Sequence, residues 1–171
     1  EELGGASAHS VKSGVTHITA AHDIDCLQKV KQLLSYLPQN CEEKAPEIPF
    51  EMGAEYRDKL MGMIPASVNQ PYDMREIIRE VADEDSFFEI HPDFAENIVV
   101  GFSRIGGRSV GIVANQPMHL AGCLDVNSSR KGARFVRFCD CFNIPLLVLV
   151  DVPGFLPGTD QEWNGIIVNG A

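Results

Sequence analysis

The first regular pattern along the chain is a set of apolar residues spaced three or four positions apart, which places side chains on one face of an α-helix. The set consists of Ile24, Leu27, Val30, Leu34 and Leu37. Asp23 stands directly before it, where a carboxylate can accept hydrogen bonds from the free N–H groups of a first turn, and Pro38 follows it. The pattern predicts a helix over residues 24–37 capped by Asp23, after a short strand at residues 14–19.

Between residues 41 and 71 no periodic pattern persists. Charged residues alternate there with prolines, and such a composition is typical of a linker or of an extended segment that crosses the surface. We therefore expect two structured parts, residues 1–40 and residues 72–171, joined by a linker over residues 41–71.

A second series of elements begins at Asp73. Asp73 and Glu76 have the spacing of a capping box, and apolar residues at helical spacing follow, so a short amphipathic helix is expected there. Residues 97–105 and 108–115 are rich in β-forming residues and are separated by Gly106-Gly107. Two glycines in this position predict a two-residue hairpin turn, because only glycine adopts positive φ at both central sites without strain.

The pattern after the hairpin predicts a helix followed by a strand. Ser128 or Ser129 is expected to cap the helix, and Asn143 is expected to end it. Four side chains should form its apolar face: Phe135, Phe138, Cys139 and Phe142. Residues 144–150 are an unbroken apolar run, which is typical of a strand covered on both faces. Hairpin, helix and strand together predict a ββα unit with a right-handed crossover, and hence an α/β fold.

Composition and charge narrow the possible functions. The chain has 171 residues, of which 44% are hydrophobic, and its 14 basic against 24 acidic residues give a formal net charge of −10. A general nucleic-acid binder needs a dense basic surface, so no nucleic acid is expected as a partner. The longest apolar run is too short to span a bilayer, and no membrane partner is expected. The five cysteines and five histidines lack the spacing of a metal or redox motif, so we expect reduced thiols and no metal.

The loop at residues 151–160 is the first candidate for a binding site. It holds two Pro-Gly turns, at Pro153-Gly154 and Pro157-Gly158, with Phe155 and Leu156 between them. Ligands gather beyond the carboxyl ends of strands in a partly parallel sheet, and a stiff loop with bare backbone beside apolar side chains suits a neutral, partly apolar ligand. A rigid turn that only ends a strand explains the same residues equally well.

A basic helix face is the second candidate. Arg130, Arg134 and Arg137 are spaced i, i+4 and i+7, so their guanidinium groups share one side of the helix, opposite the phenylalanines. Near a helix N-terminus, Arg130 and Arg134 could hold a carboxylate or a phosphate. A solvated face that balances acidic residues elsewhere is the alternative, and it is favoured because most stripes of this kind bind nothing specific.

Several longer strings of the chain are also found together in one known family. They are residues 2–15 (ELGGASAHSVKSGV), 97–102 (NIVVGF), 110–117 (VGIVANQP), 122–129 (GCLDVNSS), 131–140 (KGARFVRFCD) and 143–159 (NIPLLVLVDVPGFLPGT). In this order they closely resemble the carboxyltransferase (β) subunits of biotin-dependent acyl-CoA carboxylases, propionyl-CoA carboxylases above all. The resemblance covers essentially the whole chain, and its DVPGFLPG string is specific.

The resemblance implies a crotonase-like (ClpP/crotonase) fold, a ββα superhelix of which this chain would hold part. The family uses this fold twice in one subunit. Residues 1–40 would then end the acyl-CoA-binding N-terminal half, residues 41–71 would link the halves, and residues 72–171 would begin the biotin-binding C-terminal half. The implied reaction moves a carboxylate from carboxybiotin to the α-carbon of an acyl-CoA, converting propionyl-CoA to methylmalonyl-CoA. Backbone N–H groups in two oxyanion holes would stabilise the enolates.

The resemblance also implies site residues, position by position. The biotin side would be lined by Gly154, Phe155, Leu156, Pro157 and Gly158. Gly4, Gly5 and His9 would lie near the acyl-CoA side. No catalytic residue is assignable, because the family's oxyanion-hole segments are expected outside this chain, and the chain alone is expected to be inactive. Val168 and Asn169 stand where the family usually has Arg-His.

Partners follow from the same resemblance. The chain has no Met-Lys-Met biotinylation site, so biotin would be carried by a partner, a biotin carboxylase or biotin carrier subunit. A coenzyme A thioester would be the substrate, the subunit would form a homo-oligomer, and the location would be the bacterial cytoplasm or the mitochondrial matrix. The alternatives are the carboxyltransferase subunit of a methylmalonyl-CoA decarboxylase or a transcarboxylase, and a non-catalytic assembly or binding fragment.

Overall fold

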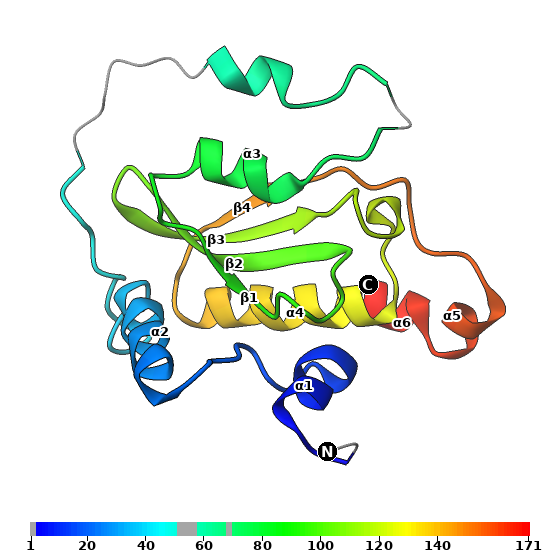
Figure 1. Ribbon diagram of the computed structural model, residues 1–171, viewed down its shortest axis with the longest axis horizontal. Helices are drawn as coiled ribbons and strands as arrows, with labels where there is room; N and C mark the ends of the chain where they lie inside the picture. Colours follow the sequence, from blue (N-terminus) through cyan, green and yellow to red (C-terminus); the bar gives the residue numbers. More distant parts are fainter. Residues whose placement is uncertain (1–2, 51–57, 68–69) are drawn as a thin grey trace.

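The fold is built around a mixed four-stranded sheet, in a computed structural model that describes residues 3–50, 58–67 and 70–171. The strands are β1 (Phe88–Ile90), β2 (Ile98–Ile105), β3 (Arg108–Asn115) and β4 (Leu146–Leu149), and they lie in this order across the sheet (Figure 1). β1 and β2 pair antiparallel, as do β2 and β3, whereas β3 and β4 pair parallel. The α/β class predicted from the sequence is confirmed.

The hairpin between β2 and β3 turns at Gly106 and Gly107, as predicted. Their φ values are 60° and 76°, and Ile105 pairs with Arg108 across the turn. The carboxylate of Asp83 accepts hydrogen bonds from both glycine N–H groups, at 2.9 and 2.7 Å. The turn is therefore fixed by positive φ values that glycine adopts freely and by an acceptor for each main-chain donor.

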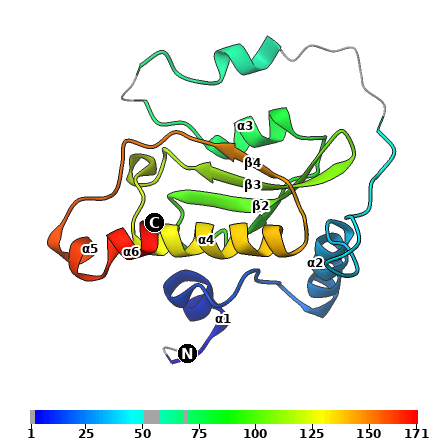
Figure 2. The same cartoon turned by 180° about the vertical axis from the view of Figure 1, so that it is seen from behind.

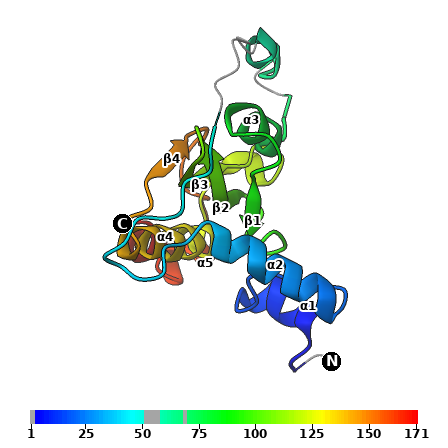
Figure 3. The ribbon, with the colours of Figure 1, turned by 90° about the vertical axis from the view of Figure 1, so that its left-hand side faces the viewer.

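Helices cover both faces of the sheet (Figure 3). α3 (Met74–Val81) packs on one face through Ile78, and α4 (Val126–Cys141) packs against β2 and β3 on the other. Adjacent side chains of β2 pack into the hydrophobic cores on opposite faces of the sheet. Val99 packs on the α3 side and Val100 on the α4 side, and both are fully buried. The side chains of a strand alternate between its faces, so β2 forms the middle of a three-layer arrangement.

The remaining elements surround this sandwich. They are α1 (Ala6–Ala8), η1 (His9–Ser13), α2 (Asp23–Ser35), η2 (Asp58–Gly62), η3 (Leu120–Gly122), α5 (Thr159–Trp163) and α6 (Ile166–Gly170). Figures 1 and 2 show α1 and α2 on the α4 side of the sheet. None of the helices in the described ranges is both long and apolar enough to cross a membrane.

The start of α4 differs from the prediction. The N-cap is Asp125, whose carboxylate accepts a hydrogen bond from the Ser128 N–H at 2.8 Å, while the Ser128 hydroxyl accepts one from the Asp125 N–H at 2.8 Å. Ser128 is thus the third helical residue of a reciprocal capping box, and neither it nor Ser129 is the cap. The predicted end is confirmed, because Asn143 follows the helix with φ 54°.

Two predictions in the first part of the chain also need correction. α2 is capped by His22, whose ring Nδ1 accepts from the Asp25 N–H at 3.1 Å, so Asp23 is the first helical residue instead of the cap. Residues 14–19 form no strand. His17 accepts a single main-chain hydrogen bond, from His91 N–H at 2.8 Å, and one bond of this kind does not make a ladder. For α3 the predicted cap is right, since the Asp73 carboxylate accepts from Arg75 N–H, but no bond from Asp73 N–H to the Glu76 side chain is found among the described residues, so the predicted capping box is not formed.

The strand predicted to be covered on both faces is an edge strand. Among the residues that the structure describes, β4 pairs with β3 alone, and its side chains alternate between half-buried and exposed, with Leu146 39% and Val148 53% exposed. Leu147 and Leu149 pack against the α3-side core, whereas α4 lies under β2 and β3. An unbroken apolar run shows that a strand suits burial, but it does not show whether a layer covers each face.

A buried arginine ties the first fifty residues to the sheet. Arg104 on β2 donates hydrogen bonds to the carbonyl oxygens of Ser35, Pro46 and Gly107, and its guanidinium lies 5.0 Å from the centre of the Tyr36 ring. One side chain therefore joins the end of α2, the segment after it and the hairpin turn. The division at residues 40 and 72 stays a prediction.

A buried lysine ties α4 to the loop between β1 and β2. Lys131 is 4% exposed, and its ammonium donates hydrogen bonds to the carbonyl oxygens of His91, Phe94, Ala95 and Ile98 at 2.7 to 3.3 Å. Burial lowers the pKa of Lys131 to about 8. The four carbonyl oxygens take the place of water around a cation that would otherwise be costly to bury.

We predict that Lys131→Met destabilises the fold by about 3 kcal/mol, because it leaves several buried carbonyl oxygens without a donor. Urea denaturation followed by circular dichroism measures the change in the free energy of unfolding. Lys59→Met is the matched control, because Lys59 forms an exposed ion pair with Glu80 at 3.4 Å and should contribute less than about 1 kcal/mol. Equal losses in the two variants would contradict the role of Lys131.

Candidate functional site

The loop after β4, residues 151–158, lies against the segment that leads into α4. Leu124 and Phe155 form a parallel bridge, in which Leu124 N–H donates to Gly154 O at 3.1 Å and Leu156 N–H donates to Leu124 O at 2.8 Å. The main chain of the loop is therefore held in an extended form, as expected of a stiff Pro-Gly segment. Gly154, Phe155, Pro157 and Gly158 remain exposed to solvent, and Leu156 is half-buried.

Asn115, at the end of β3, clamps this loop to η3. Its side-chain oxygen accepts from Asp151 N–H, and its amide nitrogen donates to Gly122 O, both at 3.2 Å. A Cβ atom on Gly122 would lie 2.6 Å from the Asp151 carbonyl oxygen, so only glycine permits this approach. Tyr72 adds a third restraint, because its hydroxyl donates to the Asp151 carboxylate at 2.6 Å.

The Phe155 side chain packs the loop against α6. A Cβ atom on Gly170 would lie 2.5 Å from the Phe155 ring, so the ring rests directly on the glycine backbone. Gly154 and Gly158 have φ values of 148° and 143°, which residues with a side chain rarely adopt. The five consecutive predicted site residues thus lie along one edge of the molecule, in a main-chain conformation that two glycines permit.

The other predicted set, Gly4, Gly5 and His9, lies at α1 and η1. His9 N–H donates to Gly5 O at 3.1 Å, and His9 Nδ1 is 2.9 Å from the hydroxyl oxygen of Ser13. Figures 1 and 3 place this segment well away from residues 151–158, on the other side of α4. Within this chain the structure does not bring the two predicted sets together.

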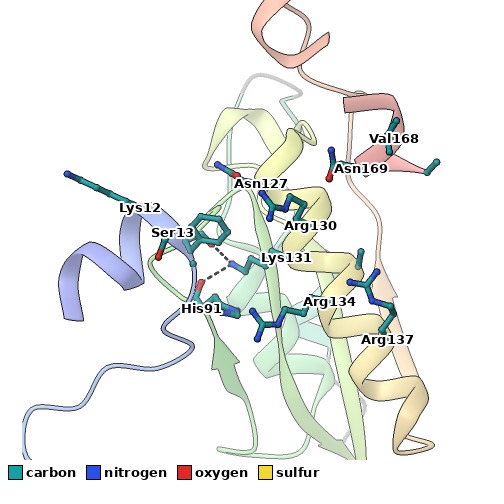
Figure 4. Close-up of a pocket in the computed structure, with 14 residues that line it drawn as sticks. Lys12, Ser13, His91, Asn127, Arg130, Lys131, Arg134, Arg137, Val168 and Asn169 are labelled. Atoms are coloured by element: carbon teal, nitrogen blue, oxygen red, sulfur yellow. Dashed lines mark hydrogen bonds between the residues drawn. The ribbon is translucent and has the colours of Figure 1, made fainter. Parts of the chain in front are cut away.

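The three arginines of α4 line a single cavity of about 640 Å³, which we call the basic cavity (Figure 4). Its walls come from η1, the loop after β1, α4 and α6. The polar side chains that line it include those of His91, Asn127, Arg130, Arg134, Arg137 and Asn169. Lys131 is turned inward to its carbonyl oxygens (Figure 4), which separates it from the arginine face.

His91 belongs to this cavity, and no sequence pattern pointed to it. Its ring packs on that of His17 with 4.2 Å between centroids and a tilt of 35° between the ring planes, and the residue is 6% exposed. Its Nε2 is buried and has no hydrogen-bond partner among the described residues. Burial, followed by the positive charges of His17, Lys131 and Arg134, lowers the pKa of His91 to about 4. The ring is neutral at physiological pH.

The low pKa of His91 predicts a loss of stability in acid. Below about pH 6.5 the unfolded chain binds a proton at this ring and the folded chain does not, so the free energy of unfolding should fall as pH decreases toward about 4. His91→Asn removes the titrating ring and tolerates the positive φ of 54° at this position.

Urea denaturation at pH 7, 6 and 5 measures the effect. The wild type should lose about 1 kcal/mol per pH unit more than His91→Asn below pH 6.5. Parallel pH profiles for the two proteins would contradict the assignment.

Other reactive groups in the described residues do not form a catalytic set. Burial raises the pKa of the Cys139 thiol to about 12, so this cysteine is not a nucleophile. No three His, Cys, Asp or Glu side chains of the described ranges cluster closely enough to hold a metal ion. Within the described ranges, the exposed loop and the basic cavity are the two candidate sites.

Comparison with known families matches residues 1–171 to the carboxyl transferase domain. The chain belongs to this family, as the sequence strings indicated. The biotin-dependent acetyl-/propionyl-coenzyme A carboxylase β5 subunit of Mycobacterium tuberculosis is 58% identical over 179 residues, and the propionyl-CoA carboxylase β chain of Cereibacter sphaeroides is 56% identical over 172. Methylmalonyl-CoA decarboxylase subunit α of Veillonella parvula is 49% identical over 172 residues. Each match covers 100% of this chain but only 32 to 34% of the relative, so the chain spans about a third of their length.

Solved structures confirm the crotonase-like carboxyltransferase fold. A crystal structure of transcarboxylase 12S, described as a hexamer with methylmalonyl-coenzyme A and methylmalonic acid bound, has a TM-score of 0.96 and 47% identity over 99% of this chain and 33% of its own. A single-chain, multi-domain long-chain acyl-CoA carboxylase has a TM-score of 0.83 and 26% identity, over 98% of this chain and 16% of its own.

Proposed function

We propose that this chain is part of the carboxyltransferase subunit of a biotin-dependent acyl-CoA carboxylase, which transfers a carboxylate from carboxybiotin to the α-carbon of propionyl-CoA. The observation that carries the proposal is a family match over all 171 residues, joined to 58 and 56% identity with two carboxylase β subunits. The decarboxylase relative is less similar, at 49%, which favours the carboxylase.

We assign the loop at residues 151–158 to the biotin side. A displayed main chain with fixed φ values offers N–H and C=O groups to a urea-like ring, and Phe155 and Leu156 supply apolar contact. Biotin would arrive on a partner subunit and would supply the activated carboxylate when bound. The residues of this chain would orient it and would not exchange a proton with it.

We assign Gly4, Gly5 and His9 to the acyl-CoA side. They lie far from the loop within one chain, so we propose that the two sides meet between two copies of the subunit in a homo-oligomer. The description of transcarboxylase 12S as a hexamer supports this arrangement. The oxyanion holes would come from other parts of the subunit. A location in the bacterial cytoplasm or the mitochondrial matrix is part of the same proposal.

A chimeric subunit tests this function. Residues 1–171 replace the matching third of the Cereibacter sphaeroides propionyl-CoA carboxylase β chain, and the chimera is combined with the biotin-carrying subunits of the same organism. We expect ATP-dependent incorporation of labelled bicarbonate into propionyl-CoA at a rate comparable with the unmodified host. Residues 1–171 alone should show no incorporation. A folded, assembled chimera without activity would refute the proposal.

The biotin-side loop predicts a second result in the chimera. Gly154→Ala meets no neighbouring atom, but its φ of 148° costs a residue with a side chain about 1 to 3 kcal/mol and should displace the loop. We expect carboxylation to fall about tenfold with the KM for propionyl-CoA unchanged. Gly62→Ala, which also meets no neighbouring atom, is the matched control and should retain full activity. Equal rates in the two variants would contradict the assignment of the loop.

A further inference from the structure

We propose that Tyr72 is a positioning residue for the loop at residues 151–158, which it holds through the side chain of Asp151. In this role Tyr72 acts through Asp151 and takes no part in the chemistry, and Asp151 is the acceptor of its hydrogen bond instead of a base. The inference rests on the proposed function, because it takes the loop as the biotin side, and it names the residue that fixes where this loop begins.

The contact between Tyr72 and Asp151 joins two segments that are far apart in the sequence. The Tyr72 hydroxyl donates a hydrogen bond to the Asp151 carboxylate at 2.6 Å, across 79 positions of the chain. Figures 1 and 2 show the segment before α3 passing beside the end of β4. The bond has the length of a charge-assisted O–H···O⁻ bond, which is about twice as strong as a bond between neutral groups. It can therefore hold the exposed Asp151 carboxylate in one orientation.

The Tyr72 hydroxyl keeps its proton in this contact. The residue is half-buried, and its ring packs against the hydrophobic core on the α3 side of the sheet. Burial, followed by the hydrogen bond and the negative charge of Asp151, raises the pKa of Tyr72 well above its usual range. At neutral pH the phenol is therefore a donor to Asp151, and it is not available as a general base.

The main chain beside Tyr72 is itself fixed to the end of β3. Gln116 is fully buried, and its Nε2 donates to the Asp73 carboxylate at 2.6 Å. Its Oε1 accepts from Met74 N–H at 3.2 Å, and Asp73 also caps α3. The Tyr72 side chain therefore extends from a main chain that a buried side chain holds in place, so the position of its hydroxyl follows from the sheet.

Asn115 and Gln116 are consecutive, but their side chains hold different segments. Gln116 bonds to the segment that leads into α3, whereas Asn115 Oδ1 accepts from Asp151 N–H at 3.2 Å. Asp151 is thus held twice, by its main chain through Asn115 and by its carboxylate through Tyr72. A residue that is held by one hydrogen bond can rotate about it, but two bonds from different directions fix its orientation.

Other contacts of the loop come from nearer in the sequence. Leu124 bonds to the main chain of residues 154 and 156, and Gln161, just past the loop, accepts from Val126 N–H at 3.0 Å. These contacts lie within residues 115–161. Tyr72 reaches the loop from the segment that follows the predicted linker at residues 41–71. Removal of its hydroxyl should leave these other contacts in place and loosen the start of the loop.

The start of the loop matters because group transfer needs its two reactants at a defined distance. A displacement of about 1 Å can lower a rate about 100-fold. Gly154 lies three residues after Asp151, so a rotation of Asp151 would move the main chain that we assign to biotin. A slower transfer step with unchanged binding of the acyl-CoA is therefore the result expected of a positioning residue, and a role in folding alone does not produce it.

Tyr72→Phe in the chimeric subunit tests the inference, because it keeps the ring and removes only the hydroxyl. We expect the maximal rate of propionyl-CoA carboxylation to fall about tenfold, with the KM for propionyl-CoA unchanged. Tyr36→Phe is the matched control, since it removes a buried hydroxyl that donates to Ser86 O in the core. This control should lower the midpoint of thermal unfolding more than Tyr72→Phe does and leave the rate unchanged.

Two substitutions of Asp151 separate positioning from proton transfer. Asp151→Asn keeps an acceptor oxygen for the Tyr72 hydroxyl and should retain about half of the rate or more, whereas Asp151→Ala should lose as much as Tyr72→Phe. The double variant that combines Tyr72→Phe with Asp151→Ala should be no slower than either single variant, because both act through one bond. Equal losses in Asp151→Asn and Asp151→Ala would overturn the inference, since the carboxylate itself would then be required.

Hydrogen exchange followed by mass spectrometry tests the positioning independently of activity. Peptides that cover residues 149–158 should exchange their main-chain N–H groups faster in Tyr72→Phe than in the wild type or in Tyr36→Phe. Equal exchange in the three proteins would overturn the inference. A wild-type chimera without carboxylation would refute the proposed function, and the exchange result would still decide whether Tyr72 holds the loop.

Discussion

The arrangement of the molecule depends on one buried cation. Lys131 places an ammonium among four main-chain carbonyl oxygens from the loop before β2 and the first residue of β2, and no carboxylate of the described residues forms an ion pair with it. This fixes the rotation of α4 about its own axis. Because Lys131 points inward, residues one position before and three after it must lie at the flank of the helix, and Arg130 and Arg134 are turned into the basic cavity. The hydrogen bonds of Lys131 thus determine which side of α4 carries the arginines.

Asn97 positions the N-terminal end of α4. It stands at the start of β2, and its amide donates to Cys123 O at 2.7 Å and to the Asp125 carboxylate at 3.3 Å. Asp125 caps α4, and the segment beside it holds the exposed loop through Leu124. The sheet therefore positions both the cavity and the loop through a few polar contacts to the beginning of α4. The cavity and the loop lie apart, but both depend on the placement of this one helix.

The features that could be predicted are those set by near neighbours in sequence. The Gly106-Gly107 turn, the Asp73 cap and the shared face of Arg130, Arg134 and Arg137 follow from spacing alone. The errors were of two kinds: the choice among neighbouring candidates for an N-cap, and features that a distant segment determines. An apolar run such as residues 144–150 is compatible with either a central or an edge strand. The prediction of Ser128 or Ser129 as the N-cap missed Asp125, because spacing does not show which residue bonds to which main-chain N–H. The inward turn of Lys131 is set by carbonyl groups 33 to 40 residues away.

The same distinction applies to the candidate site. The two Pro-Gly turns predicted a stiff loop after residue 150, and the main-chain contacts of residues 151–158 explain why it is stiff. The hydrogen bond between Asn115 and Asp151 could not be predicted, because it joins residues 36 positions apart and leaves no periodic pattern in the sequence. The arginine face was expected to be solvated because a stripe of charges normally finds water or acids. In the structure Arg130, Arg134 and Arg137 are exposed to solvent, and the buried ring of His91 lies beside them. Solvent can satisfy an exposed guanidinium, whereas the nitrogen of His91 is closed to solvent and to any ligand atom of similar size, so its burial depends on packing between distant segments that no spacing in the sequence shows.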